Sequence, residues 1–510
     1  MDQDALNLGH NLSANADYRL NKKDLVATTL QLNRREMGVS GATLFEELNA
    51  SRQRTDIYNR FRSQEQTNWF ADGSLAFKRT TTPQKHEFIA EVRFNHQDDR
   101  DLTELYRQSV INTAAHSEIE NDDTDGTTNS VTAQVDYTKM LNKTVKLETG
   151  YKMNNRMLDR DFTVMKDQNG TGVFVPSDLT NALDFSEMTN AAYAVFSKGS
   201  KKVDWQAGLR AEYADRSFTL ATTNTEYPHK YSSLFPSGMV NFKLNDKSQA
   251  KLSYSRRIRR PGTQELNPFP NFFDVSNVFK GNPNLKPEYT DAVEASYQRS
   301  GVYGSLQIAP FYRRTHDIIR VDINTADSIQ GREVTSISFT NLDNSDSWGA
   351  DINGQFRFGK QISGLAGINA FKMVTDGGSE SALGSNAISC MARFNMNYAY
   401  NPATTFMVNS WYRGATKIEK GKFNATSFAS LAVRRKLQGE KLVATLRVND
   451  LFASTRFGIN TGDENITQFT SRYFNNRAVY LNLQYSWGKP PKLTERRQDD
   501  QPQGGSPFGG

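Results

Sequence analysis

The feature that most constrains the fold is a strict two-residue alternation of apolar and polar side chains, which recurs along the chain. One apolar-rich set near the N-terminus consists of Leu6, Leu8, His10, Leu12, Ala14, Ala16, Tyr18 and Leu20. Polar residues and one glycine occupy the positions between its members. This period is typical of a β-strand with two different faces, and the run is longer than an average strand of about five or six residues. Long strands are therefore predicted, and no helical segment of useful length is predicted.

The connections between these segments are short and long in turn. Short polar turns are predicted at 21–24, near Pro83, and at 142–143, 198–202, 245–248, 299–304, 359–364, 401–403 and 438–440. Longer connections are predicted at 37–63, 99–127, 161–187, 222–231, 261–287, 324–332, 375–386, 415–422 and 456–465. Membrane barrels have tight turns at the periplasmic end and long loops at the outer end, whereas a soluble sandwich has no reason to separate them. We therefore predict an all-β, antiparallel transmembrane β-barrel whose apolar set faces lipid and whose polar set lines the lumen.

The composition agrees with a wall that is one residue thick. Hydrophobic residues make up 37% of the chain, below the roughly 45–50% of a soluble globular protein. The chain nevertheless contains 31 Phe and 20 Tyr, and disordered chains are poor in aromatic residues. The net charge of +6 comes from scattered Arg and Lys residues, so a nucleic-acid partner is not expected.

The number of strands raises a problem of parity. Nine hairpins and one last strand give about nineteen strands, so the first and last strands would run in the same direction. Bacterial single-chain barrels close antiparallel with an even number of strands. The N-terminal segment MDQDALNLGHN also lacks the basic region and apolar core of a signal peptide. We expect residues 1–488 to be an N-terminally incomplete barrel, and residues 489–510, rich in Pro, Gly and charge, to be a disordered periplasmic tail.

Several segments between about 190 and 490 resemble one known family. These segments are SLFPSGMVNFKLNDKSQAKLSYSRRIRRP, LNPF, GNPNLKPEYTDAVEASY, LRVNDLF and RAVYLNLQYSWGK. They resemble the barrel of TonB-dependent outer-membrane receptors and, more narrowly, the outer-membrane β-barrel family common in Bacteroidetes. The resemblance implies a barrel of about twenty-two strands, filled by an N-terminal plug whose short box engages the energy-coupling protein. Neither the plug nor the box is recognisable here. If the barrel has twenty-two strands, three are missing, which is an odd number, as the parity argument requires.

The most specific part of the resemblance is the connection 261–287 with its flanks. We take it as a structural motif at the barrel rim, made of Arg260, Pro261, Leu266, Asn267, Pro268, Gly281, Asn282, Pro283, Leu285, Pro287 and Glu288. The prolines cannot donate to a sheet ladder and prevent strand formation. Gly281 and Asn282 tolerate left-handed backbone angles, which suits a tight reversal. The arginines at 256, 257, 259 and 260 either reach lipid head groups or pair across loops. A rigid loop anchor is favoured over direct ligand contact.

Other candidate sites are weaker. Asn121, Asp123, Asp125 and Gly126 are spaced like the first half of a calcium loop, but the twelfth position holds Thr132 instead of Glu. An ordinary acidic loop is favoured over a weak divalent-cation site. The six histidines form no ligand pair, and no nucleophile motif, Gly-rich phosphate loop or metal signature is present. We therefore expect no catalytic residue, cofactor or metal, and the chain is not expected to be an enzyme.

The leading functional hypothesis is the barrel of an active outer-membrane importer. Its expected partners are outer-membrane lipid, a small-molecule or oligomeric nutrient such as a siderophore, and, if a plug lies upstream, an energy-coupling inner-membrane complex. The alternative is a non-transporting barrel that acts as an adhesin or scaffold through its outer loops. A soluble β-solenoid is less favoured because the strand and loop lengths give no fixed repeat.

Overall fold

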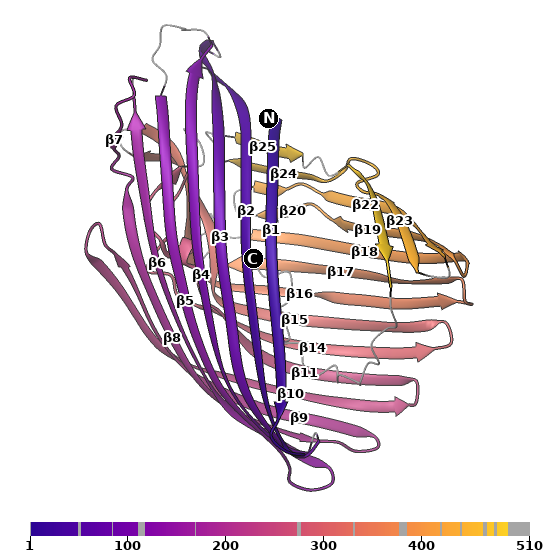
Figure 1. The fold of residues 1–510 in the computed structure, drawn as a ribbon. Coiled ribbons are helices and arrows are strands. Elements are labelled where there is room, and N and C mark those ends of the chain that lie inside the picture. Colours follow the sequence, from indigo (N-terminus) through magenta and orange to yellow (C-terminus); the bar gives the residue numbers. More distant parts are fainter. Residues whose placement is uncertain are drawn as a thin grey trace.

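The computed structural model is almost entirely β-structure, arranged as one long meandering sheet that curls strongly on itself (Figure 1). It describes residues 2–48, 51, 53–83, 85–110, 118–168, 170–272, 277–329, 332–376, 385–418, 421–438, 441–462, 467–473 and 477–487. The sheet contains 22 strands in these residues, three of which are only two or three residues long. The other nineteen form the wall, and each pairs antiparallel with its neighbours along the chain.

The wall strands follow the order of the sequence. They are β1 (Asp2–Arg19), β2 (Asp24–Leu48), β3 (Arg54–Thr82), β4 (His86–Ser109), β5 (Glu118–Met140), β6 (Val145–Asp167), β8 (Asn181–Lys198), β9 (Val203–Leu220), β10 (Thr225–Asn245), β11 (Ser248–Arg259), β14 (Glu288–Gly301), β15 (Gly304–Ile329), β16 (Arg332–Phe358), β17 (Ile362–Asp376), β18 (Ser385–Asn401), β19 (Thr404–Arg413), β22 (Thr426–Leu437), β23 (Leu442–Val448) and β26 (Val479–Tyr485). The predicted all-β, antiparallel fold with about nineteen strands is confirmed.

Shorter elements lie in the connections. They are β7 (Val175–Pro176), α1 (Thr263–Leu266), β12 (Asn271–Phe272) and β13 (Asn277–Phe279), and a separate four-stranded sheet of β20 (Thr416–Ile418), β21 (Gly421–Phe423), β24 (Arg456–Gly462) and β25 (Thr467–Tyr473). Among the described residues, no helix is long and apolar enough to cross a membrane. The predicted tail 489–510 lies outside the described residues.

The described strands end and begin on either side of the nine predicted short turns, and the described parts of most of the long connections are largely strand. The expected loop 37–63 is largely strand, because β2 and β3 stay paired up to Leu48 and Arg54. Likewise, β4 and β5 stay paired up to Arg107 and Glu118. Beyond the bilayer both faces of a strand meet water, so the apolar alternation ends while the backbone ladder continues. The sequence pattern therefore reports the lipid-facing part of each strand and misses its polar extension.

The two faces of the wall carry opposite chemistry, as predicted. Large apolar side chains on one face have no protein covering them: Leu209 is 51% exposed and Val135 is 41% exposed. The residues next to them in the sequence point to the other face, which is polar. On that face Asp72 is 5% exposed, and its carboxylate forms an ion pair with Arg93 at 2.8 Å. We call the apolar face the outer face and the polar one the inner face. This arrangement suits a wall between lipid and a wet lumen.

The two ends of the sheet do not pair with each other in the described residues. β1 pairs only with β2, and β26 pairs only with β23. Because nineteen antiparallel strands alternate in direction, these two edge strands run the same way. Each edge leaves a row of backbone donors and acceptors without a ladder partner.

Candidate functional site

The connection between β11 and β14, residues 260–287, crosses the inner face of the wall near the outer ends of β9 and β16. We call it the inner loop. Its strand β13 pairs in parallel with Thr335–Ile337 of β16. Since β14 and β15 lie between β11 and β16 in the sheet, the inner loop must pass both strands to reach that edge. The loop therefore joins parts of the wall that are far apart.

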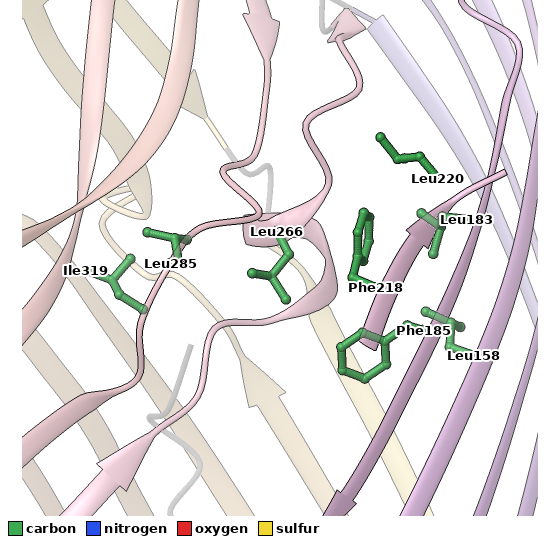
Figure 2. Close-up of a cluster of buried hydrophobic side chains, with 8 residues drawn as sticks. All are labelled: Leu158, Leu183, Phe185, Phe218, Leu220, Leu266, Leu285 and Ile319. Atoms are coloured by element: carbon green, nitrogen blue, oxygen red, sulfur yellow. The ribbon is translucent and has the colours of Figure 1, made fainter. Parts of the chain in front are cut away.

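Two leucines fix the inner loop to the wall. Leu266 at the end of α1 is 1% exposed and Leu285 is fully buried. Figure 2 shows both between wall side chains that come from several strands, namely Leu158, Leu183, Phe185, Phe218, Leu220 and Ile319. Burying one leucine contributes about 1.5–3 kcal/mol. The cluster is thus the main apolar core on the inner face.

Two asparagines tie the backbone of the inner loop to β16. The Asn282 side chain donates to the Phe339 carbonyl at 3.0 Å. On the wall side, the Asn341 amide donates to the Lys286 carbonyl at 3.1 Å and accepts from the Lys286 N–H at 2.8 Å. This pair of bonds imitates a strand ladder and fixes the loop just before it re-enters the wall as β14.

Gly281 is required by close backbone approach and not by a left-handed conformation. Neither Gly281 nor Asn282 has a positive φ, so the left-handed prediction is wrong. A Cβ at position 281 would lie 2.6 Å from the carbonyl oxygens of Gln264 and Asn267. The Gly281 N–H donates to that Asn267 carbonyl at 2.7 Å. The two limbs of the inner loop can therefore touch only where a side chain is missing.

Replacing Gly281 by Ala is expected to loosen the inner loop by about 1–3 kcal/mol, because the methyl group would push its two limbs apart. Hydrogen exchange of the backbone amides in 262–287 should then become faster, while exchange in the wall strands is unchanged. Gly262→Ala is the matched control, since a Cβ there meets only the far end of Glu265, at 3.7 Å. Equal protection in the two variants would contradict the close-approach argument.

The prolines of the motif lie at the two ends of the inner loop and within it. Pro261 and Pro287 are buried where the chain leaves β11 and rejoins β14, and Pro268 and Pro283 are half-buried. Asn267 closes α1, since its N–H donates to the Thr263 carbonyl at 3.0 Å. The four prolines have no backbone N–H to donate, so they hold the loop in a non-strand path.

Charged groups complete the anchoring at the start of the inner loop. Arg260 binds the Glu212 carboxylate at 2.6 Å and donates to the Tyr231 hydroxyl at 2.8 Å. Arg210 binds the same carboxylate at 2.5 Å. Arg259 forms ion pairs with Glu265 and Glu288. For Arg259 and Arg260, the structure therefore has pairing across the loop and the wall, and not contact with lipid head groups.

Arg216 is a central residue that the sequence interpretation did not single out. It is 2% exposed, and one guanidinium nitrogen donates to the Leu285 carbonyl at 3.3 Å, while Nη1 is buried without a hydrogen-bond partner. The alternation of the sequence could have placed it on the inner face, because Arg216 is an even number of positions from Arg210 and Glu212, which also lie on that face.

A cavity of about 460 Å³ lies between the inner loop and strands β3, β4, β5, β6 and β8. One side is polar and rich in acceptors: Gln66 donates to the Asp101 carboxylate at 2.5 Å, and Gln97 donates to the Asp99 carboxylate at 2.8 Å. On β6, the cavity is lined by Leu158 and Phe162 and by Arg160 between them. A cavity with charged, neutral polar and apolar lining residues suits a small ligand that has both polar groups and an apolar part.

Asp122 lies near the outer end of β5, in the extension beyond the bilayer. Burial and the neighbouring Glu120 carboxylate raise the pKa of Asp122 to about 7, against the opposing effect of Lys166 and two arginines. One carboxylate oxygen is buried without a hydrogen-bond partner. A raised pKa in the folded state means that Asp122 disfavours the folded hairpin once it is ionised.

Local stability around Asp122 is therefore expected to be highest near pH 4 and to fall as pH rises to about 7, by at most about 4 kcal/mol. Hydrogen exchange of the β4–β5 hairpin, corrected for the intrinsic pH dependence of exchange, measures this change. Asp122→Asn should be equally protected at pH 5 and pH 8. If Asp122→Asn shows the same pH dependence of exchange as the native chain, Asp122 is not the source of that dependence.

The loop predicted at Asn121, whether an ordinary acidic loop or a calcium site, is wrong in its local structure. Residues 118–140 form β5, so Asn121, Asp123 and Asp125 lie in a row on one face, roughly 7 Å apart, and the extended backbone cannot wrap around one ion. Asp123 and Asp125 instead pair with Arg100 at 3.0 and 3.6 Å. Among the described residues, no group of three His, Cys, Asp or Glu side chains is placed to hold a metal.

Comparisons with known proteins agree with this architecture. The model of the outer membrane protein beta-barrel family matches residues 78–485. This match begins well before residue 190, where the sequence segments that resemble the family begin. No curated protein sequence matches the chain.

Solved structures with a similar fold include three receptors or transporters. The siderophore receptor PiuA from Acinetobacter baumannii has a TM-score of 0.55 at 10% identity, covering 94% of this chain and 80% of that one. The copper transporter OprC has a TM-score of 0.53 at 11% identity, with coverages of 95% and 80%. The ferric yersiniabactin uptake receptor FyuA from Yersinia pestis has a TM-score of 0.51 at 11% identity, with coverages of 93% and 78%. At these identities the likeness concerns the fold alone.

Proposed function

The chain belongs to the outer membrane protein beta-barrel family, and from this premise we propose that it forms the barrel of an importer for a small nutrient. The cargo class is a small molecule or a short oligomer, with a siderophore as one example. The wall contacts outer-membrane lipid through its apolar outer face. The role is transport and not catalysis.

One observation carries the proposal: an outer connection is folded onto the inner face and leaves a cavity beside it. The cavity of about 460 Å³ is within the usual range of small-ligand pockets, roughly 300–1,000 Å³. A barrel that acted only as an adhesin would expose its binding groups outward, whereas this cavity opens among inward side chains such as Asp99 and Asp101. The placement favours passage of a ligand along the lumen.

Import against a concentration gradient also needs energy and a moving part. We propose that a plug engages an inner-membrane complex, and that displacement of the plug opens the lumen after cargo has bound. The tail 489–510 would then lie in the periplasm, because the last short turn and the end of β26 lie at the same end of the wall.

The free edges of β1 and β26 support a further part of the proposal. An unpaired strand edge in lipid costs several kcal/mol for each orphaned backbone group. We propose that an odd number of additional strands, three in a barrel of about twenty-two, closes the sheet between these edges. The reading frame upstream of Met1 tests this: it should encode strands with the same alternation.

Growth of a strain that lacks the gene tests the import function. The strain is grown with single limiting sources of iron, cobalamin, peptide or oligosaccharide, with and without the restored gene. We expect loss of growth on one source at low concentration and recovery on restoration. A protonophore should abolish uptake of that source, because the transport is energised. Equal growth of both strains on every source would contradict the importer, and loss of adhesion alone would favour the scaffold alternative.

A further inference from the structure

A second and larger cavity lies on the opposite part of the inner face, away from the inner loop. Its volume is about 1060 Å³, and it is bounded by β15 to β19, the first residue of β22 and the segment that begins β24. Arg393 lies eight residues before the end of β18, and Trp411 lies seven residues after the start of β19. Since a barrel strand crosses the bilayer in about 9–11 residues, the cavity is at membrane depth within the lumen.

The lining of this cavity is cationic. Arg313, Arg393, Arg413 and Arg456 contribute to it, and among the described lining residues Asp351 is the one carboxylate. The Asp351 carboxylate is occupied by Asn369, which donates to it at 2.5 Å. The described lining residues therefore carry an excess of positive charge.

Three of the arginines have no acidic partner among the described residues. Arg393 donates to the neutral Asn353 amide at 2.9 Å. Arg413 has a buried Nε without a hydrogen-bond partner and lies 5.8 Å from the Phe423 ring. Arg313 lies over the Phe311 ring at 4.0 Å. Arginines that only support a fold are usually paired, as Arg210 and Arg260 are with Glu212.

Flat apolar groups stand beside these guanidinium groups. Trp411 lines the cavity and stacks on Phe428, with ring centroids 6.3 Å apart and planes at 17°. Phe457 lines the far side. A guanidinium group binds a carboxylate through two parallel hydrogen bonds, and an aromatic wall favours a planar body.

We propose that this cavity binds a small planar ligand that carries two or more carboxylate-type acidic groups. The arginines neutralise the acidic groups, and Trp411 contacts the planar part. The cavity is a separate site from the one beside the inner loop. Binding of the ligand to this cavity needs no transport. Only the statement that the ligand lies on the import path rests on the proposed import function.

Calorimetry on the purified full chain in a non-ionic detergent tests the proposal, with benzene-1,3,5-tricarboxylate as the probe. The uncharged 1,3,5-tris(hydroxymethyl)benzene is the matched control ligand. We expect the tricarboxylate to bind and to weaken as salt is raised, and the alcohol not to bind. Equal binding of the two ligands, or no binding of either at millimolar concentration, would overturn the proposal without any variant.

Variants then locate the site. Arg393→Gln and Arg413→Gln should each weaken tricarboxylate binding about tenfold or more, the usual loss for one charged hydrogen-bonding partner. Arg434→Gln is the control, because Arg434 lies on β22 outside the cavity and is exposed. A heat-modifiable band on a gel checks that each variant is folded. If Arg434→Gln weakens binding as much as Arg413→Gln does, the assignment of the site is wrong. If the purified chain binds the tricarboxylate but cells show no measurable uptake, the binding site stands and the import function is contradicted.

Discussion

Arginine in place of Leu209 is expected to destabilise the inserted barrel by about 2–4 kcal/mol, because a cation on the outer face at membrane depth must leave water. Leu209 is 51% exposed in the absence of lipid, so this loss does not come from disrupted protein packing. Guanidinium titration of the barrel in phospholipid vesicles measures the effect. Val135→Arg on β5 should behave in the same way.

The matched controls are Gln206→Arg and Gln134→Arg, which place the same cation on the inner face of the same two strands. Each should change the free energy of unfolding by less than about 1 kcal/mol, because the lumen is wet. Equal losses for Leu209→Arg and Gln206→Arg would mean that the two faces do not differ in their surroundings. The assignment of the outer face to lipid would then be wrong.

Removal of the Glu212 carboxylate should have the second large effect. The carboxylate is 9% exposed and binds both Arg210 and Arg260, so Glu212→Gln leaves two cations without their partner. Breaking a buried ion pair typically costs about 3–5 kcal/mol, and the partial exposure of both arginines reduces this to about 2–3 kcal/mol. Faster hydrogen exchange throughout the inner loop measures the loss.

Glu148→Gln is the control for this change. Glu148 is also a carboxylate of the inner face and binds Lys146 at 2.8 Å, but it is 35% exposed. Exposed pairs contribute about 0–1 kcal/mol, so this variant should leave the inner loop protected. If both variants loosen the loop equally, Glu212 is not the group that anchors it.

The wall was predictable from the sequence because its determinants are local. Alternation sets which face each residue occupies, and a polar pair such as Asn142 and Lys143 marks a turn without reference to distant residues. The extensions of β2 to β5 were not predictable in this way. Their residues have water on both sides, so the alternation that identifies a strand is absent where the strand continues.

The path of the inner loop could not be read from the sequence. Leu266 and Leu285 are isolated apolar residues in a polar, Pro-rich segment, and their partners lie on β6, β8, β9 and β15. The alternation predicts the face on which Phe218 lies, but it does not predict which residues contact Phe218 on that face. The same limit applies to the ion pair of Glu212 with Arg260, because the two residues are 48 positions apart and no local pattern links them.

The measurement that tests the central claim most directly is the accessibility of spin labels along β9 in lipid vesicles. Single cysteines at positions 205 to 211, in a background with Cys390 replaced by Ser, carry the labels. The account predicts that collisions with oxygen, which concentrates in lipid, are highest at 205, 207, 209 and 211. Collisions with a water-soluble nickel chelate should be highest at 206, 208 and 210. If the two accessibilities rise and fall together, or show no period of two, this sheet is not a wall between lipid and a wet lumen.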